Sequence, residues 1–179
     1  MILILNGPSS SGKTTLAREL QRVWPRPLYY LSYDSVNAKM APFRYRERTA
    51  PPAEGHGLPM DEVRDFLSVL YLTAAAIDRS GRDVVIDNCL FDTEDIYPLS
   101  MELTAGCEVF FVRIDTALEE LERREAARGD RPAGKALWQR EHLTPKEDEA
   151  YDLILRGEER AGDNARRILS ALFGPGGGT

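Results

Sequence analysis

The chain is poor in cysteine and has no apolar run long enough to cross a membrane. Its 179 residues include two cysteines, Cys89 and Cys107, too few for the disulfide framework of a small secreted domain. We expect both to be reduced, partly buried thiols. The apolar stretch at residues 1–5 is too short for a bilayer and lacks the basic leader of a signal peptide. The sequence therefore predicts a cytoplasmic protein with no membrane segment.

An excess of positive charge is also missing. The formal net charge is −6, whereas binding along a nucleic-acid backbone demands an electropositive surface, so we do not expect nucleic acid as a partner. A nucleotide is still compatible with this charge, because one loop and a few cations can hold its phosphates. With no internal repeat and a length suited to one domain, we predict a single domain over residues 1–173. The glycine-rich residues 174–179 are expected to form a flexible tail.

Segments typical of strands and of helices alternate along the chain. The expected strands are residues 2–5, 28–33, 83–87, 108–114 and 152–155. The expected helices are residues 12–24, 60–79, 96–103, 116–127 and 164–173. Such alternation predicts an α/β fold, in which a mostly parallel sheet has helices on both faces and binds its ligand at the carboxyl ends of the strands.

Two segments do not fit this alternation. Residues 41–59 are rich in proline, glycine and arginine, and residues 128–134 are polar with two glycines. We predict that both are loops over a site, the first lining an acceptor pocket and the second belonging to a lid at about 124–134.

The most specific signal follows the first expected strand. Residues 7–14 read Gly-Pro-Ser-Ser-Ser-Gly-Lys-Thr, which satisfies the phosphate-loop pattern G-x-x-x-x-G-K-[ST] in full. Its backbone N–H groups converge on phosphate at the start of a helix. Lys13 reaches the β- and γ-phosphates, and the Thr14 hydroxyl ligates Mg²⁺. The predicted nucleotide-binding residues are Gly7, Ser9, Ser10, Ser11, Gly12, Lys13, Thr14 and Thr15. The chain has no G-x-G-x-x-G, which excludes a dinucleotide fingerprint.

Phosphate loops occur in kinases, GTPase switches and motors. The rest of the chain must therefore show to which of these classes the protein belongs. A guanine-reading Asn-Lys-x-Asp is missing; residues 37–40 resemble it faintly but carry Met40 in place of the aspartate and come too early. A motor domain usually needs more than the 179 residues present here. The sequence thus favours a small-molecule kinase that uses ATP and Mg²⁺.

Two carboxylates follow expected strands. Asp34 comes just after the second strand, where a carboxylate can take the proton from an attacking hydroxyl; the alternative is a helix N-cap. Asp87 ends the third strand, where it can hold Mg²⁺ directly or through water; the alternative is a turn residue.

Arginines cluster near residue 128. If the helix continues, Arg124, Arg128 and Arg131 share one face, and such a face suits the charge of a triphosphate. We interpret it as a lid, with Arg124 binding the nucleotide and the other two acting in catalysis. The alternative is a solvated face paired with acidic neighbours at 119, 120 and 122.

Together these features resemble the chloramphenicol phosphotransferase family of P-loop kinases. The similar stretches are residues 4–7, 33–35, 85–87, 127–131 and 133–134. The resemblance implies a three-layer P-loop kinase fold with a five-stranded, mostly parallel sheet, and phosphorylation of a small-molecule hydroxyl such as that of an antibiotic. It also implies that Asp34 is the catalytic base and that Arg128 and Arg131 are lid arginines.

Two other functions remain open, a nucleoside or RNA-end kinase and a nucleotide-dependent binding switch. Arg44, Arg46 and Arg48 would point the same way in an extended segment. This arrangement favours an acceptor with an anionic or strongly polar group. The loop at 156–158 is our choice for the adenine contacts.

Overall fold

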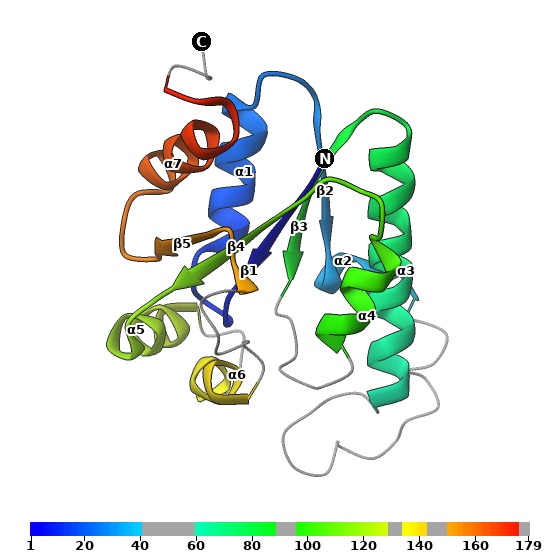
Figure 1. Cartoon of the computed structure of the whole chain (residues 1–179). Coiled ribbons are helices and arrows are strands. Elements are labelled where there is room, and N and C mark those ends of the chain that lie inside the picture. The colour runs from blue at the N-terminus through cyan, green and yellow to red at the C-terminus, as the bar shows by residue number, and fades with distance from the viewer. Residues whose placement is uncertain (41–59, 89–95, 129–133, 143–149, 176–179) are drawn as a thin grey trace.

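A five-stranded parallel sheet forms the centre of the protein (Figure 1). The structure is a computed structural model that describes residues 1–40, 60–88, 96–128, 134–142 and 150–175. The strand order is β2-β3-β1-β4-β5, and every neighbouring pair is parallel. The strands are β1 (Ile2–Asn6), β2 (Leu28–Ser32), β3 (Asp83–Asn88), β4 (Val109–Asp115) and β5 (Leu153–Arg156).

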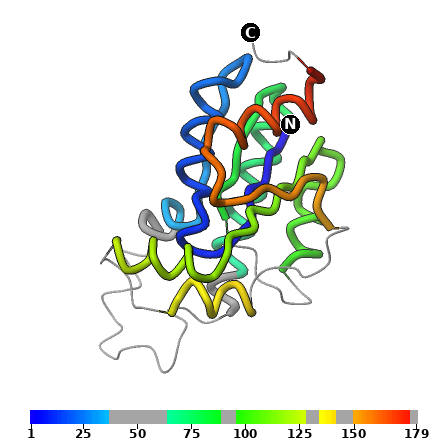
Figure 2. Tube along the Cα trace, turned by 90° about the vertical axis from the view of Figure 1, so that its left-hand side faces the viewer, coloured from blue at the N-terminus to red at the C-terminus, as the bar shows by residue number. Residues whose placement is uncertain are grey.

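The central strand β1 is buried on both faces, as its continuous apolar sequence predicts. Its side chains alternate between two hydrophobic clusters. Leu3 and Leu5 pack on the side of α1 (Lys13–Val23) and α7 (Ala161–Phe173). Ile2 and Ile4 pack on the opposite side, which is covered by α3 (Met60–Arg79) and α4 (Ile96–Leu103). The result is a three-layer α/β fold (Figures 1 and 2).

Three other helices lie at the end of the sheet to which the strands point (Figure 1). They are α2 (Tyr33–Met40), α5 (Leu118–Arg128) and α6 (Lys135–His142). The parallel strands deliver their terminal polar residues to this same edge, so the fold places the phosphate loop, Asp87 and the start of α2 together.

The predicted fold class is confirmed, with local differences. The second strand ends at Ser32 rather than at residue 33, because Tyr33 already begins α2. Helix α6 was not expected from the sequence, and α7 begins at Ala161, three residues before the prediction. The predicted loop at 41–59, with its three arginines, lies outside the described residues. None of the described helices is long and apolar enough to cross a membrane. Cys107 is a free thiol, and Cys89 lies outside the described part.

Candidate active site

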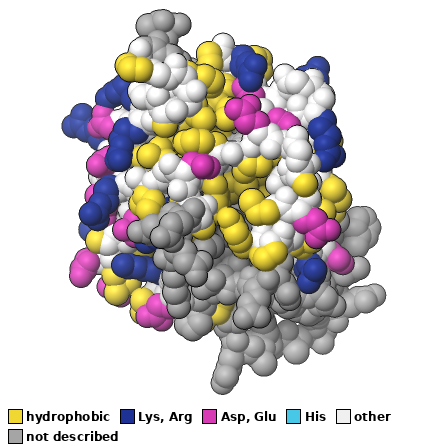
Figure 3. Space-filling model, in the orientation of Figure 1, with side chains coloured by type: hydrophobic (Ala, Val, Ile, Leu, Met, Phe, Trp, Pro, Cys, Tyr) yellow, Lys and Arg dark blue, Asp and Glu magenta, His cyan; other side chains and the backbone are white. Residues whose placement is uncertain are grey.

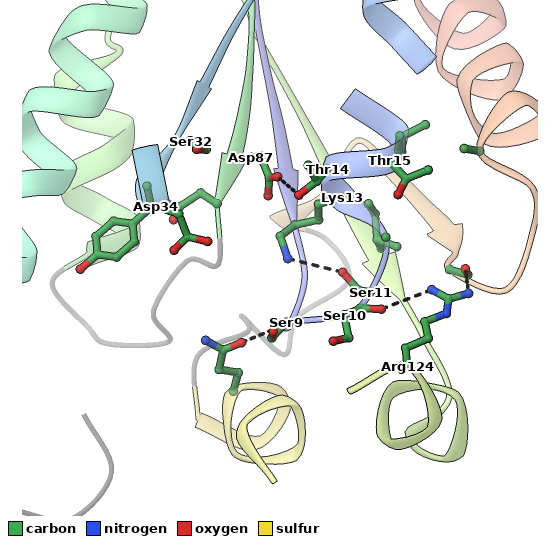
Figure 4. Close-up of a pocket in the computed structure, with 18 of the residues that line it drawn as sticks. Ser9, Ser10, Ser11, Lys13, Thr14, Thr15, Ser32, Asp34, Asp87 and Arg124 are labelled. Atoms are coloured by element: carbon green, nitrogen blue, oxygen red, sulfur yellow. Dashed lines mark hydrogen bonds between the residues drawn. The ribbon is translucent and has the colours of Figure 1, made fainter. Parts of the chain in front are cut away.

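A cavity of about 750 Å³ opens at the carboxyl ends of the strands. The phosphate loop and the first turn of α1 line its centre, and the start of α2 and the end of β3 line one side. Helices α5 and α6 and the segment after β5 line the other (Figure 4). Every nucleotide-binding residue predicted from the sequence, except Gly7, borders this cavity.

The glycines of the phosphate loop are required by space and by backbone conformation. A Cβ on Gly7 would lie 2.9 Å from the Ile114 carbonyl oxygen and 2.9 Å from Ser11 Oγ, closer than such contacts allow. Gly12 has a φ of 101°, which L side chains rarely adopt. The loop can therefore pass close to β4 and turn sharply into α1, whose first residue is Lys13.

Lys13 is buried inside the curve of this loop. Its ammonium group donates hydrogen bonds of 2.7 Å to the carbonyl oxygens of both Gly7 and Pro8, and its Nζ is 3.5 Å from Ser11 Oγ. The side chain thus folds back over the loop and holds a positive charge at the centre of the cavity, where phosphate would bind.

Thr14 and Asp87 bring two side-chain oxygen atoms together at the edge of the cavity. The Thr14 hydroxyl donates a 2.6 Å hydrogen bond to Asp87 Oδ2, and the Tyr30 hydroxyl donates one of 3.1 Å to the same atom. Burial and the nearby Asp87 charge raise the pKa of Tyr30, which keeps that hydroxyl a donor. Two hard oxygens suit Mg²⁺, which takes few protein ligands and completes its shell with phosphates and water. The described residues hold no group of three or more His, Cys, Asp or Glu that could bind a metal.

Asp34 lies in the first turn of α2 and lines the cavity. Figure 4 shows its carboxylate and the Lys13 ammonium extending into the same space from opposite sides. Helix α2 is capped by Ser32, whose hydroxyl oxygen accepts a 3.1 Å hydrogen bond from the Ser35 N–H. Because Ser32 fills that role, the structure supplies a cap without the Asp34 carboxylate.

Arg124 and Arg123 are neighbours with different surroundings. Arg124 donates from Nη1 to the Ser10 carbonyl oxygen at 3.3 Å and from Nη2 to the Gly157 carbonyl oxygen at 2.8 Å. Arg123 is mostly exposed and pairs with Glu120, which Arg124 also contacts. Hydrogen bonds from both arginines lower the pKa of Glu120 to about 2. Figure 3 shows basic and acidic side chains interleaved along the edge that carries α5 and α7.

The structure thus gives the predicted arginine face a mixed character. Arg124 is hydrogen-bonded to the phosphate loop, but it also pairs at 2.6 Å with Glu120, one of the acidic partners of the alternative interpretation. Arg123, which is not part of the predicted face, pairs with the same carboxylate. Arg128 is the last residue of α5. Arg131 lies outside the described residues.

The loop after β5 packs directly against the phosphate loop. A Cβ on Gly157 would overlap Thr116 Oγ1 and lie 2.8 Å from the Ser11 carbonyl oxygen, so only glycine fits. Gly157 lines the cavity together with Glu159 and the start of α7. This is the segment that the sequence suggested for adenine contacts.

Two residues that position the walls of the cavity were not predicted from the sequence. Gln139 of α6 accepts a 2.6 Å hydrogen bond through Oε1 from the Ser9 N–H. Glu125 of α5 is buried, and its two carboxylate oxygens accept hydrogen bonds of 2.8 Å and 3.0 Å from the N–H groups of Gly134 and Ala136. Glu125 thereby caps α6 and fixes it to α5. No sequence motif marks either residue, since each acts through the fold.

Two asparagines stiffen the edge of the sheet beneath the cavity. Asn6 and Asn88 end β1 and β3 and lie opposite each other in register. The Asn6 side-chain amide donates to the Tyr151 hydroxyl at 2.8 Å, and that of Asn88 donates to the Tyr71 hydroxyl at 3.0 Å. All four residues are buried, so the neutral polar network is held in one arrangement.

The fold and the phosphate loop define the chain as a P-loop kinase-type protein. It belongs to the chloramphenicol phosphotransferase-like family, because the family model of that description matches residues 1–172. The resemblance inferred from the motifs is therefore confirmed.

Two curated relatives carry an activity in their names. A guanylate kinase of Oleidesulfovibrio alaskensis is 31% identical over 152 residues, covering 74% of this chain and 66% of the relative. A Mycobacterium tuberculosis protein assigned by name to the O-phosphotransferases is 27% identical over 149 residues, covering 74% of this chain and 65% of the relative. The chain thus spans slightly less than two thirds of these relatives' own length.

Solved structures share the fold over nearly the whole chain. A sugar kinase of Janibacter sp. superposes with a TM-score of 0.70 at 22% identity, covering 99% of this chain and 98% of that one. APS kinase of M. tuberculosis gives 0.67 at 19% identity, with 96% of each chain covered. Shikimate kinase of Aquifex aeolicus gives 0.61 at 17% identity, with 97% of each covered. At these identities the likeness establishes the fold alone.

Proposed function

We propose that this protein transfers the γ-phosphoryl group of ATP to a hydroxyl group of a small molecule, with Mg²⁺ as its metal. The observation that carries the proposal is the convergence of three groups on one cavity: the Lys13 ammonium, the Thr14–Asp87 oxygen pair and the Asp34 carboxylate. The Lys13 ammonium and the pair of oxygens that could bind a metal lie across the cavity from the Asp34 carboxylate. Phosphoryl transfer to a hydroxyl needs such an arrangement. Because ATP is supplied in the cytoplasm, we place the reaction there.

The roles of the residues follow from their positions. Lys13 holds the β- and γ-phosphates beside the N–H groups of the loop. Thr14 and Asp87 would hold Mg²⁺, which would supply positive charge to neutralise the phosphates. Asp34 orients the acceptor hydroxyl and takes its proton as the acceptor oxygen bonds to the γ-phosphorus and the bond to the bridging oxygen of ADP breaks.

The lid assignment extends this scheme. Arg124 donates a hydrogen bond to the Ser10 carbonyl oxygen of the phosphate loop. It therefore positions the loop beside the nucleotide. Arg128 and Arg131 would neutralise charge that redistributes in the transition state. Replacing either with alanine should then lower turnover more than it raises the KM for ATP. An effect on thermal stability alone would overturn that part of the proposal.

Two acceptor classes have support. The family's description favours an amphenicol antibiotic, and the described wall near Asp34 includes the neutral residues Tyr33, Ser35 and Asn88. The arginines of the 41–59 segment favour an acceptor with an anionic or strongly polar group. A second candidate function, a kinase acting on nucleosides, is favoured by the relative named as a guanylate kinase.

The test is an acceptor panel analysed by mass spectrometry. Amphenicols, neutral alcohols, anionic alcohols of similar size and nucleosides are incubated with the protein, ATP and Mg²⁺, and Lys13→Ala is the matched control. The proposal predicts an acceptor that gains one phosphoryl group with the wild type alone. Release of ADP and phosphate with no phosphorylated acceptor would instead favour a nucleotide-dependent switch.

A further inference from the structure

Three helices hold the phosphate loop at three consecutive residues, Pro8, Ser9 and Ser10 (Figure 4). The outer two are held through their carbonyl oxygens, by a lysine of α1 at 2.7 Å and by an arginine of α5 at 3.3 Å. The middle one is held through its N–H, which donates a 2.6 Å hydrogen bond to Oε1 of Gln139 in α6. The shape of the loop thus depends on a neutral side chain of α6 as well as on two cations.

The side chain of Gln139 is oriented by this contact. A backbone N–H donates and does not accept, so the atom that faces Ser9 is the oxygen of the side-chain amide. Gln139 also borders the cavity, as does Lys135, which lies four residues earlier on the same face of α6. This face of α6 is therefore turned towards the candidate active site.

A buried carboxylate determines where α6 lies. Glu125 of α5 is 4% exposed, and its two oxygens accept from the N–H groups of Gly134 and Ala136 at 2.8 Å and 3.0 Å. A negative charge at this end of a helix satisfies donors that have no partner within the helix and interacts favourably with its dipole. A helix of eight residues has little stability of its own, so the contacts with α5 decide where its side chains lie.

We infer that Gln139 is a positioning residue for phosphoryl transfer, and that Glu125 holds it in place through α6. Neither residue has to contact the reacting atoms, because Gln139 acts through the backbone of Ser9. A small displacement of the loop should slow transfer more than it weakens nucleotide binding. Transfer requires an in-line arrangement of the reacting atoms, whereas binding in the ground state is spread over many contacts. The inference rests on the proposed function, since it assigns a role in that reaction.

Two substitutions and a matched control test the inference. Gln139→Met keeps the length of the side chain and removes the acceptor oxygen. Arg140→Met introduces the same residue at the neighbouring, exposed position of α6. Glu125→Gln leaves one acceptor oxygen for two N–H groups.

Each protein is measured in four ways. Hydrogen exchange of residues 7–12 is followed by mass spectrometry without nucleotide, and thermal unfolding gives the Tm. Calorimetry gives the Kd of a non-hydrolysable ATP analogue. Turnover is measured with ATP, Mg²⁺ and the acceptor panel.

The expected result separates turnover from binding. Gln139→Met should exchange faster in the loop and turn over about tenfold or more slowly, with the Kd within about twofold of the wild type. Glu125→Gln should also speed exchange in the loop, which it does not contact, and Arg140→Met should match the wild type. Because Glu125 acts through Gln139, the turnover of the double variant should be close to that of Gln139→Met alone.

Several results would overturn the inference. Wild-type exchange and turnover in Gln139→Met would show that the contact has no role. Tighter binding of the analogue with unchanged turnover would show that Gln139 obstructs the loop. Equal losses of affinity and turnover with a lowered Tm would show a structural role, and additive losses in the double variant would separate Glu125 from Gln139. If the wild type phosphorylates no acceptor, the proposed function fails and the role in transfer fails with it. The exchange data need no nucleotide, so they distinguish that failure from a failure of the contact itself.

Discussion

The hydroxyl of Thr14 donates a 2.6 Å hydrogen bond to Oδ2 of Asp87. The two residues are 73 positions apart in the chain, on the first turn of α1 and near the end of β3. The parallel pairing of β1 with β3 brings them together, because both strands end at the same edge of the sheet. This contact joins the phosphate loop to the carboxylate that the sequence proposed as a metal ligand.

Removal of the buried cation tests the phosphate loop. Lys13→Ala deletes the ammonium group that bridges the Gly7 and Pro8 carbonyl oxygens. We expect phosphoryl transfer to be lost and ATP binding to weaken, because nothing else in the loop's curve replaces a charge on the β- and γ-phosphates. Coupled-enzyme measurement of ADP release checks the result. Turnover within a few-fold of the wild type would show that the loop does not bind the reacting phosphates.

Asp34→Asn tests the base. The substitution keeps the size of the side chain, and Ser32 still caps α2, so the fold and ATP affinity should be preserved. Turnover should fall by about 10²–10⁴-fold, the usual contribution of general-base catalysis. ATP affinity and single-turnover rates are measured together. If affinity collapses while turnover per bound nucleotide persists, Asp34 is a structural residue.

Arg124 and Arg123 form a matched pair for testing the link between α5 and the phosphate loop. Arg124→Ala removes hydrogen bonds to the Ser10 and Gly157 carbonyl oxygens, and we expect turnover to fall about tenfold or more. Arg123→Ala removes an exposed ion pair with Glu120 and should change turnover by less than about twofold. Equal effects of the two substitutions on turnover would contradict a specific role for Arg124.

A buried carboxylate far from the cavity predicts a pH dependence of stability. Burial alone would raise the pKa of Asp83, but hydrogen bonds from Arg26, Trp24 and the N-terminal ammonium outweigh it and lower the pKa to about 2. Because the pKa in the folded state lies below the unfolded value, this stabilisation is complete above about pH 4 and is lost as the pH falls from about 4 towards 2. It amounts to about 2 kcal/mol.

Asp83→Asn provides the measurement. The variant should have a lower free energy of unfolding at pH 7 and a weaker dependence of that energy on pH between about 2 and 4. Denaturant unfolding at a series of pH values gives both quantities. An unchanged slope in that window would show that Asp83 does not supply the acid sensitivity.

The parts of the structure that the sequence predicted are those set by local patterns. The apolar run of β1 and the phosphate-loop motif were enough to place the site, because both are properties of adjacent residues. Helix α6 has no strong apolar periodicity, and Glu125 fixes its start from another helix. The contact of Gln139 with Ser9 joins residues 130 positions apart. Such pairings arise from the packing of whole elements, so the pattern of residues along the chain does not reveal them.

The conformation of Ser10 illustrates the same limit within a recognised motif. The pattern of the phosphate loop accepts any residue at this position, so the motif gives no sign of a positive φ. In the structure the φ of Ser10 is 65°, and the loop around it is held by Gln139 of α6 and Arg124 of α5. The motif thus predicted the loop at the candidate site, whereas the positive φ of Ser10 is visible only in the folded structure.

The most direct test of the central claim follows the phosphoryl group itself. ATP labelled with oxygen-18 in its γ-phosphoryl group is incubated with the protein, Mg²⁺ and the acceptor panel, and the products are analysed by mass spectrometry. The account predicts that the labelled phosphoryl group appears on an acceptor hydroxyl with the wild type, and at least about a hundredfold more slowly with Asp34→Asn. Labelled inorganic phosphate as the sole product, in equal amount from both proteins, would contradict it.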